Sequence, residues 1–362
     1  MSRFAKNARV FFFEEPIFEQ GEPHLQSVVC PQTGVLVQTS VLPHGLAATE
    51  IAVQQKRLLT QLLREKRLEQ YVAWYYTPMA REFTNDLQPA VTVYDCMDEL
   101  SGFAGAPPAM AANEKDLFAA ADLVFTGGAS LFAAKKKQHK AVYLFPSSVD
   151  VAHFARAKTI AREPADQAEI PHPRIGYAGV IDERMDLPLL RYVAERRPDW
   201  QIVLLGPVVK IDPQTLPKTP NIHYLGMKPY AELPAYFSGW KVGLLPFALN
   251  DSTKFISPTK TPEYLAAGLR VVSTPIRDVM SPYGEQGLAA IGKTPDEFVE
   301  AAGSLLSECS TSGFERRANA FLAQSSWDRT WREMNDLITT LLPAKEKPFK
   351  AAQNAQKGLV HV

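Results

Sequence analysis

The sequence predicts an α/β protein with two doubly wound parallel-sheet domains that face each other across a cleft. The first observation is that short apolar runs alternate with helical patterns through both halves of the chain. Strands that alternate with helices form parallel sheets covered by helices on both faces. The second observation is the length of 362 residues, which exceeds one typical core and indicates two domains.

The first domain is expected over residues 1–155. Its first strand is the continuous apolar run 10–13. Residues 25–30 and 34–39 alternate around a turn and predict a hairpin, and a long amphipathic helix is expected over 47–70. The remaining strands are expected at 71–76, 90–94, 123–126 and 141–145, and the remaining helices at 79–87, 113–121 and 129–137.

Residues 156–173 contain three prolines and little apolar pattern, so they are expected to form an interdomain linker. The second domain is expected over 174–326. Its pattern predicts strands at 174–180, 201–205, 222–225 and 242–246, and helices at 187–196 and 230–237. The chain from 294 to 342 is mostly helical in pattern. Residues 343–362 are rich in Lys, Ala and Gln, and we expect a flexible tail there.

Composition excludes several functional classes. A hydrophobic content of 46%, a charged content of 22% and a formal net charge of zero are typical of a soluble globular protein and argue against a nucleic-acid binder. The three cysteines show no metal-ligand spacing, which fits a reducing compartment. No apolar run is long enough to span a membrane, and 10–13 is too short for a signal-peptide core. These features predict a cytoplasmic protein.

A basic run follows the helix expected at 129–137. It consists of Lys135, Lys136, Lys137 and Lys140. One interpretation is a solvated helix end, which the helix dipole also favours. The other is docking on an anionic membrane, which would place the protein at the inner face of the plasma membrane.

The segment 257–274 is the most informative stretch of the chain. It predicts a loop, a short helix, a stop at Gly268 and a buried strand. The helix has two candidate starts, Ser257 and Thr261, each a hydroxyl residue followed by proline. With either start, Lys260 lies beside the positive end of the helix, where a phosphate would be held. Glu263 faces the same end of the helix and could accept hydrogen bonds from sugar hydroxyls. The structural alternative is an ordinary surface lysine and a capping glutamate.

Polar residues also follow the expected strands of the first domain. Asp95 and Asp98 come after the strand at 90–94, glycines 127 and 128 follow the next strand, and His44 precedes the long helix. Ligands bind at the carboxyl ends of parallel strands, so together these residues indicate the acceptor side of a cleft. Taken singly, each has a structural explanation as a turn, a bend or a packed histidine. The glycine pair does not form a dinucleotide-binding fingerprint.

The order of motifs in the second half resembles that of bacterial GT-B glycosyltransferases. The similarity is greatest to the retaining, nucleotide-sugar-dependent enzymes of family four, also called group 1. The residues that carry it are Ile175-Gly176-Tyr177-Ala178-Gly179, Arg184, Tyr224-Leu225-Gly226, Ser257-Pro258-Thr259-Lys260, Glu263-Tyr264-Leu265-Ala266-Ala267-Gly268 and Val271-Val272, together with 149–154 and Ser326-Trp327.

The resemblance implies roles for these residues. Glu263 would hold the ribose of a nucleotide, and the helix start would hold its diphosphate. Arg184 would provide a further cation, and Met227 would border the nucleobase through its backbone. The donor site implied in this way comprises Gly179, Arg184, Met227, Lys254, Ser257, Thr259, Lys260 and Glu263. The resemblance also implies that a final helix, 327–342, crosses back onto the first domain and contacts it through Trp327 and Trp331.

One departure from the family pattern affects the donor sugar. The family's first motif Glu, eight residues before Glu263, is replaced by Phe255, and Asp251 or Lys254 could substitute for it. A second departure, Arg270 in place of a proline, is expected to be harmless.

The implied function is transfer of a sugar from a nucleotide-diphosphate sugar to a glycan or lipid-linked acceptor. Transfer would proceed with retention and without metal or other cofactor, in surface polysaccharide synthesis. The sequence lacks an Asp-x-Asp motif in a fitting loop. Asp98, Asp95 or His44 would take the acceptor's proton, with Asp98 preferred. The alternatives are a nucleotide-sugar epimerase of the GT-B type and a non-catalytic nucleotide-sugar-binding protein.

Overall fold

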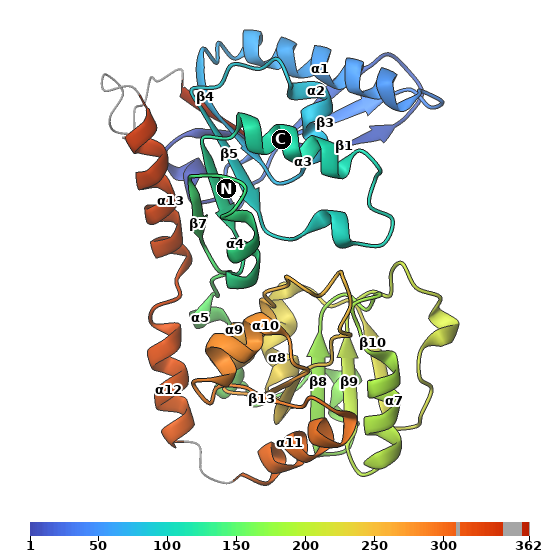
Figure 1. Cartoon of the computed structure of the whole chain (residues 1–362). Coiled ribbons are helices and arrows are strands. Elements are labelled where there is room, and N and C mark those ends of the chain that lie inside the picture. The colour runs from blue at the N-terminus through green and yellow to red at the C-terminus, as the bar shows by residue number, and fades with distance from the viewer. Residues whose placement is uncertain (309–311, 343–356, 362) are drawn as a thin grey trace.

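Two parallel sheets form two stacked domains (Figure 1). The structure is a computed structural model, and it describes residues 1–308, 312–342 and 357–361. The first sheet has the strand order β2-β3-β1-β14-β4-β5-β6-β7, and the second has the order β10-β9-β8-β11-β12-β13. All pairings in both sheets are parallel except the hairpin β2–β3. The two doubly wound α/β domains predicted from the sequence are therefore confirmed.

The helices that connect the strands of the first domain pack on one face of its sheet, and the final long helix of the chain packs on the other. Its strands are β1 Arg9–Phe18, β2 His24–Val29, β3 Leu36–Leu42, β4 Gln70–Tyr75, β5 Val91–Cys96, β6 Leu123–Thr126 and β7 Val142–Leu144. Its helices are α1 Ala48–Glu65, α2 Arg81–Thr84, α3 Met110–Ala120 and α4 Ala129–Lys135. Helix α1 is shorter than the expected 47–70, since Arg67 adopts a positive φ of 51° and turns the chain into β4.

The second domain is also a parallel sheet flanked by helices. Its strands are β8 Arg174–Ala178, β9 Gln201–Leu205, β10 Ile222–Gly226, β11 Val242–Leu245, β12 Arg270–Ser273 and β13 Ala290–Ile291. Its helices are α7 Leu187–Arg196, α8 Leu233–Phe237, α9 Lys260–Ala267, α10 Arg277–Val279, α11 Pro295–Ser307 and α12 Ser312–Leu322. Strands β8, β11 and β12 are almost wholly buried, which explains their continuous apolar runs.

The expected linker, 156–173, is packed onto the second domain. The short helix α5 Val151–Ala155 precedes this segment, and helix α6 Ala165–Ala168 lies within it. The Gln167 side chain is fully buried, donates to the Tyr236 carbonyl oxygen (2.9 Å) and accepts from Trp240 Nε1 (2.8 Å). Ile170 joins the core of the same domain. This segment is therefore a structural part of the second domain.

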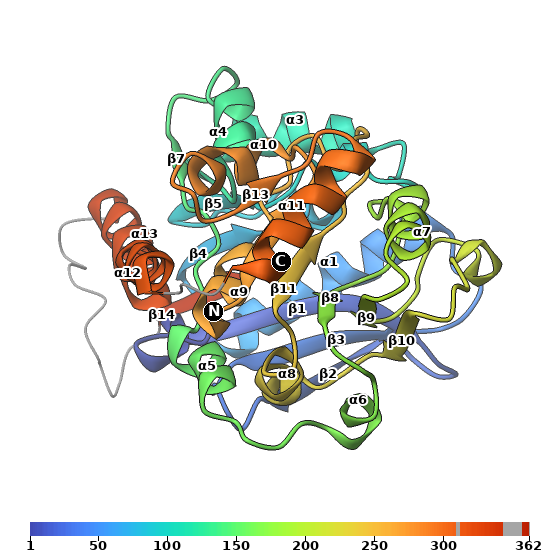
Figure 2. The ribbon, with the colours of Figure 1, turned by 90° about the horizontal axis from the view of Figure 1, so that it is seen from below.

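The final long helix, α13 Trp327–Leu341, lies against the first domain. In both views α12 and α13 run along the same side of the molecule (Figures 1 and 2). Ile338 is buried in the core on one face of the first sheet, and Trp331 meets Phe4 edge-on with 5.9 Å between ring centroids. The apolar face of α13 thus joins the chain after the second domain to the first.

The expectation of a flexible tail over 343–362 is wrong for its last part. Residues Lys357–His361 form β14, which pairs in parallel with β1 on one side and β4 on the other. Leu359 and Val360 are buried in the cores on opposite faces of the first sheet. Residues 343–356 and 362 lie outside the described part of the chain. The strand was missed because its apolar run is very short and its partners are far away in sequence.

Candidate active site

The start of α9 forms the floor of the candidate site. The helix begins at Lys260, after Thr259 at the N-cap position, so it matches neither of the two expected starts. The Thr261 N–H bonds the Pro258 carbonyl (3.3 Å) and the Glu263 N–H bonds the Thr259 carbonyl (3.4 Å). Pro262 falls in the first turn, where a missing N–H costs no helical hydrogen bond. Gly268 ends the helix as predicted, with a positive φ of 87°.

Lys260 crosses the glycine turn after β8. A Cβ atom on Gly179 would lie 2.1 Å from Lys260 Cε, so a larger residue at this position would displace the end of the lysine side chain. The ammonium lies 5.8 Å from the centroid of the Tyr177 ring and has no salt-bridge partner among the described residues. Burial lowers the pKa of Lys260, and the Glu263 carboxylate partly opposes the shift. A partly buried cation without a salt bridge, placed beside a helix N-terminus, is suited to an anionic ligand.

Glu263 is held one turn into the same helix. Burial raises its pKa to about 7, and Lys260 acts in the opposite direction. Tyr230 lies near this carboxyl group, which contributes to the raised pKa of its hydroxyl after the larger effect of burial. The Tyr230 ring is half exposed and stacks on His153 with 4.4 Å between centroids. The N-terminal end of α9 therefore combines a cation, a carboxyl group and an accessible aromatic ring.

Arg184 brings the two domains together. Its guanidinium forms a bidentate pair with Asp182, with Nη2 at 2.6 Å from Oδ2 and Nε at 3.0 Å from Oδ1. It also lies over the ring of Phe103 in the first domain, 5.6 Å from the centroid. Burial raises the pKa of Asp98, and the Arg184 cation opposes this shift. A donor-side cation and an acceptor-side carboxyl group predicted from separate domains therefore lie close enough to interact.

Phe255 has a role that the sequence did not indicate. Its side chain packs against the core of the first domain rather than remaining in the donor loop. In the same loop, the Asp251 carbonyl oxygen would lie 3.1 Å from a Cβ on Gly102 of the first domain. Lys254 is exposed, with its ammonium 5.4 Å from the Phe255 ring centroid. The loop that carries the family's first motif Glu here forms an apolar contact between domains.

A second interdomain contact lies beside Ser257. Asp278 Oδ1 accepts a hydrogen bond from the Ser130 N–H (3.0 Å) and so caps α4 of the other domain. Gly128 is required at this point, because its Cβ would lie 2.2 Å from Asp278 Oδ2 and 2.8 Å from the Ser257 Cβ. Burial raises the pKa of Asp278. This contact holds the loop before α9 against the first domain.

The remaining predicted residues are dispersed. Met227 follows β10 and its side chain is 76% exposed, while Thr259 is exposed at the N-cap of α9. His44 is exposed on the loop before α1, with its ring 6.2 Å from that of Phe18. Asp95 is only 4% exposed and its Oδ2 accepts from Trp74 Nε1 at 3.1 Å. Strand alternation turns Asp95 toward the α13 face of the sheet, which separates its setting from that of Asp98.

The membrane-docking hypothesis is wrong for Lys135. This residue is 2% exposed, and its ammonium pairs with Glu114 (2.8 Å) and Glu99 (2.9 Å). Lys136, Lys137 and Lys140 are exposed. Among the described residues, no helix is both long and apolar enough to cross a bilayer. No cluster of His, Cys, Asp or Glu in that part of the chain could hold a metal ion.

The sequence did not predict three residues that contact Arg184 or join the two domains at the candidate site. Asp182 could have been found, because an acidic residue two positions before Arg184 is well placed to pair with it. Phe103 and Asp278 carry no local signal, since each acts on a residue of the other domain.

Comparison with known proteins finds similarity to glycosyltransferases in the second domain. Residues 173–308 match the family model for group 1 glycosyl transferases. The chain is also 24% identical over 166 residues to TuaH of Bacillus subtilis (strain 168), which by its name is a glycosyltransferase of teichuronic acid biosynthesis. That alignment covers 44% of this chain and 41% of TuaH. It therefore spans about two fifths of the relative's length.

Solved structures extend the similarity to both domains. Sucrose-phosphate synthase from Thermosynechococcus elongatus aligns with a TM-score of 0.68 and 15% identity, over 94% of this chain and 90% of that one. A trehalose-phosphate synthase from Burkholderia xenovorans gives 0.67 and 13%, over 94% and 95%. WaaG, a glycosyltransferase of lipopolysaccharide biosynthesis, gives 0.59 and 12%, over 91% and 99%. This chain therefore has the GT-B fold, and its residues 173–308 match the family model for group 1 glycosyl transferases.

Proposed function

We propose that this protein transfers a sugar from a nucleotide-diphosphate sugar to a hydroxyl group of a glycan or lipid-linked acceptor. The reaction would proceed with retention and without a metal ion, in surface polysaccharide synthesis. The group 1 domain supports the reaction class. The names of TuaH and WaaG, which refer to teichuronic acid and lipopolysaccharide, support the setting.

The observation that carries the proposal is the partly buried ammonium of Lys260 at the start of α9, which forms no salt bridge with any residue that the structure describes. A leaving nucleoside diphosphate gains negative charge as the sugar–phosphate bond breaks. Cations and helix N–H groups that are already in place stabilise this charge without reorganisation. Arg184 supplies a second cation, although its pairing with Asp182 leaves only part of its charge for a ligand. Two protein cations could then neutralise a diphosphate without a metal ion.

The nucleoside would lie along α9 and the end of β10. An ionised Glu263 can accept hydrogen bonds from both ribose hydroxyls. The exposed Tyr230 ring near Glu263 offers a face for stacking. Met227 would border the base through its backbone, which is consistent with a side chain that points into solvent.

Transfer then requires one bond exchange and one proton transfer. The bond between the anomeric carbon and the phosphate oxygen breaks, and its electron pair goes to the diphosphate. The acceptor oxygen bonds to the same carbon and releases its proton. Asp98 is our candidate for receiving this proton, because burial raises its pKa and it lies near Arg184 at the donor side. Asp95 and His44 are less suitable, since Asp95 is bonded to Trp74 and His44 is exposed on a loop.

The test is turnover of uridine- and guanosine-diphosphate sugars with and without acceptor glycans. Free nucleoside diphosphate that appears with a glycosylated acceptor supports transfer, and its anomeric configuration by NMR reports retention. Activity that survives a chelator supports metal independence. An altered but unconsumed sugar would indicate an epimerase, and binding without turnover would overturn the proposal. Docking of Lys136, Lys137 and Lys140 on membranes remains a prediction, to be tested by sedimentation with anionic vesicles.

A further inference from the structure

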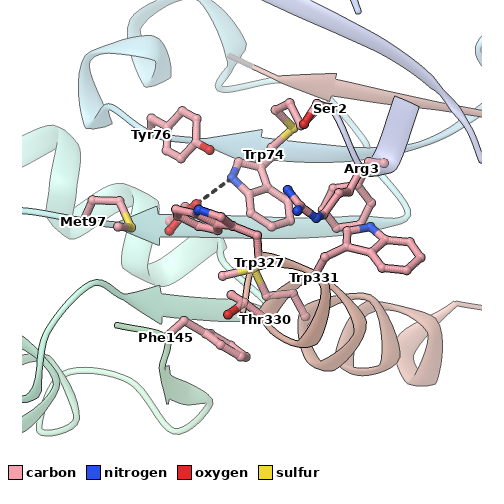
Figure 3. Close-up of a pocket in the computed structure, with 13 residues that line it drawn as sticks. Ser2, Arg3, Trp74, Tyr76, Met97, Phe145, Trp327, Thr330 and Trp331 are labelled. Carbon is pink, nitrogen blue, oxygen red and sulfur yellow. Dashed lines mark hydrogen bonds between the residues drawn. The ribbon is translucent and has the colours of Figure 1, made fainter. Parts of the chain in front are cut away.

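An aromatic pocket lies between the first sheet and α13, outside the donor site. It has a volume of about 250 Å³ and is shown in Figure 3. Trp327 and Trp331 project from α13 toward the strand that carries Trp74 (Figure 3). Tyr76 and Phe145 follow the carboxyl ends of β4 and β7 and complete the aromatic wall.

Unpartnered polar atoms lie among these rings. Asp95 lines the pocket, and its Oδ2 is bonded to Trp74 Nε1 (Figure 3). Its Oδ1 is buried and has no hydrogen-bond partner among the described residues, and the same holds for Trp331 Nε1. A buried polar atom without a partner costs stability unless a ligand or water satisfies it. The pocket therefore offers one acceptor and one donor to a molecule that carries hydroxyl groups.

A pyranose ring matches this combination. Its C–H faces are apolar and stack on aromatic rings, while its hydroxyls both donate and accept hydrogen bonds. A hydrocarbon chain would fit the walls but would leave Asp95 Oδ1 unsatisfied. The volume lies just below the usual range for drug-sized ligands, which indicates a single ring rather than an oligosaccharide.

The pocket also connects to the donor side. A second groove of about 290 Å³ shares Phe145 and Thr330 with it and extends to Ser257 and Asp278. Ser257 lies three residues before the start of α9. A bound glycan could therefore have one ring in the aromatic pocket while a neighbouring part lies toward the donor.

We propose that this pocket is a carbohydrate subsite that binds one pyranose ring of the acceptor glycan. The role of the ring as acceptor rests on the proposed function, whereas binding of the ring does not. Asp95 would accept a hydrogen bond from a ring hydroxyl, and Trp327 at the mouth would stack on the ring.

Binding of a glycoside in the pocket can be measured through the tryptophans of the chain. Of the five in the chain, Trp74, Trp327 and Trp331 line the pocket, whereas Trp200 and Trp240 are buried in the second domain. The full chain is labelled with 5-fluorotryptophan, and its ¹⁹F NMR signals are assigned by Trp→Phe variants. It is then titrated with methyl glycosides of glucose, galactose and N-acetylglucosamine. We expect at least one glycoside to shift the three pocket signals and leave the other two unchanged.

Two variants of Trp327 test its contribution to glycoside binding. Trp327 is 39% exposed, so its replacement leaves the core filled. Trp327→Ala should weaken glycoside binding about tenfold, whereas Trp327→Phe should retain most of it. Both should bind uridine and guanosine diphosphates like the parent, as isothermal titration would show.

Three results would overturn the inference. These are no shift with any glycoside, shifts of equal size at Trp200 and Trp240, and shifts with a prenyl alcohol but with no glycoside. If nucleotide sugars are turned over while the pocket signals stay still, the subsite is wrong and the proposed function stands. If glycosides bind in the pocket while no nucleotide sugar is consumed, the proposed function is wrong and the binding site stands.

Discussion

Replacing Lys260 should have opposite effects on nucleotide binding and on stability. The ammonium is partly buried without a salt bridge to any described residue, and this burial lowers its pKa, so keeping the charge destabilises the protein without ligand. Lys260→Met keeps the length of the side chain and removes the charge. The free energy of unfolding without ligand should therefore stay level or rise.

The affinity for nucleoside diphosphate should fall. Truncating one partner of a buried, hydrogen-bonded charge pair costs about 2–5 kcal/mol. A value of about 3 kcal/mol raises the dissociation constant roughly 150-fold. Part of the site remains, because the α9 N–H groups and Arg184 are unchanged, so binding should be weakened rather than abolished.

Isothermal titration with uridine and guanosine diphosphates measures the affinity, and urea unfolding measures the stability. Lys136→Met is the matched control, since Lys136 is an exposed lysine on the other domain. A Lys260→Met protein that binds the parent's nucleotide within about threefold of the parent would refute the assignment of the diphosphate to α9. A large loss of stability without ligand would refute the idea that the ammonium is uncompensated.

Three further predictions concern other parts of the site and the fold. Gly179→Ala should displace Lys260 and weaken nucleotide binding by a similar factor, whereas Gly303→Ala, with no atom nearer than 3.5 Å, should change neither binding nor fold in the same titrations. Glu263 has a folded-state pKa of about 7 against an ordinary value of 4.5, so its protonation favours the folded state below pH 4.5. That contribution, about 3 kcal/mol, is lost as pH rises through 7. In Glu263→Gln the urea midpoint should therefore fall less steeply between pH 4.5 and 7. An unchanged pH dependence of the midpoint would contradict the burial of Glu263. Val360→Asp should destabilise the first domain by roughly 3 kcal/mol or more, because Val360 is fully buried in β14, and an unaltered urea midpoint would argue against that strand.

Several local features were predicted from the sequence, although α9 begins at neither of its two expected starts. The segment that forms α9 carries its own signals, because a proline fits only the first turn and a glycine suits the left-handed stop. Lys260 and Glu263 follow from that helix, since their positions relative to its start are set by a few neighbouring residues of one chain. Asp98 was placed at a strand end for the same reason, and parallel topology then brings strand ends to one edge.

Features that depend on distant parts of the chain were predicted poorly. Lys135 belongs to a basic run in the sequence, yet Glu99 and Glu114 turn it into a buried ion pair. Phe255 occupies a motif position of the donor loop, yet it contacts the core of the other domain. No pattern within a few residues contains these partners.

The sequence by itself determined two doubly wound domains and the helix tip with its lysine and carboxylate, because periodicity and turn chemistry act over a few neighbouring residues. Only the tertiary structure decided which face Asp95 occupies, where β14 inserts and how α13 closes the aromatic pocket. Those outcomes depend on the free energy of burying groups that lie far apart along the chain, and a short window of sequence does not contain both members of such a pair.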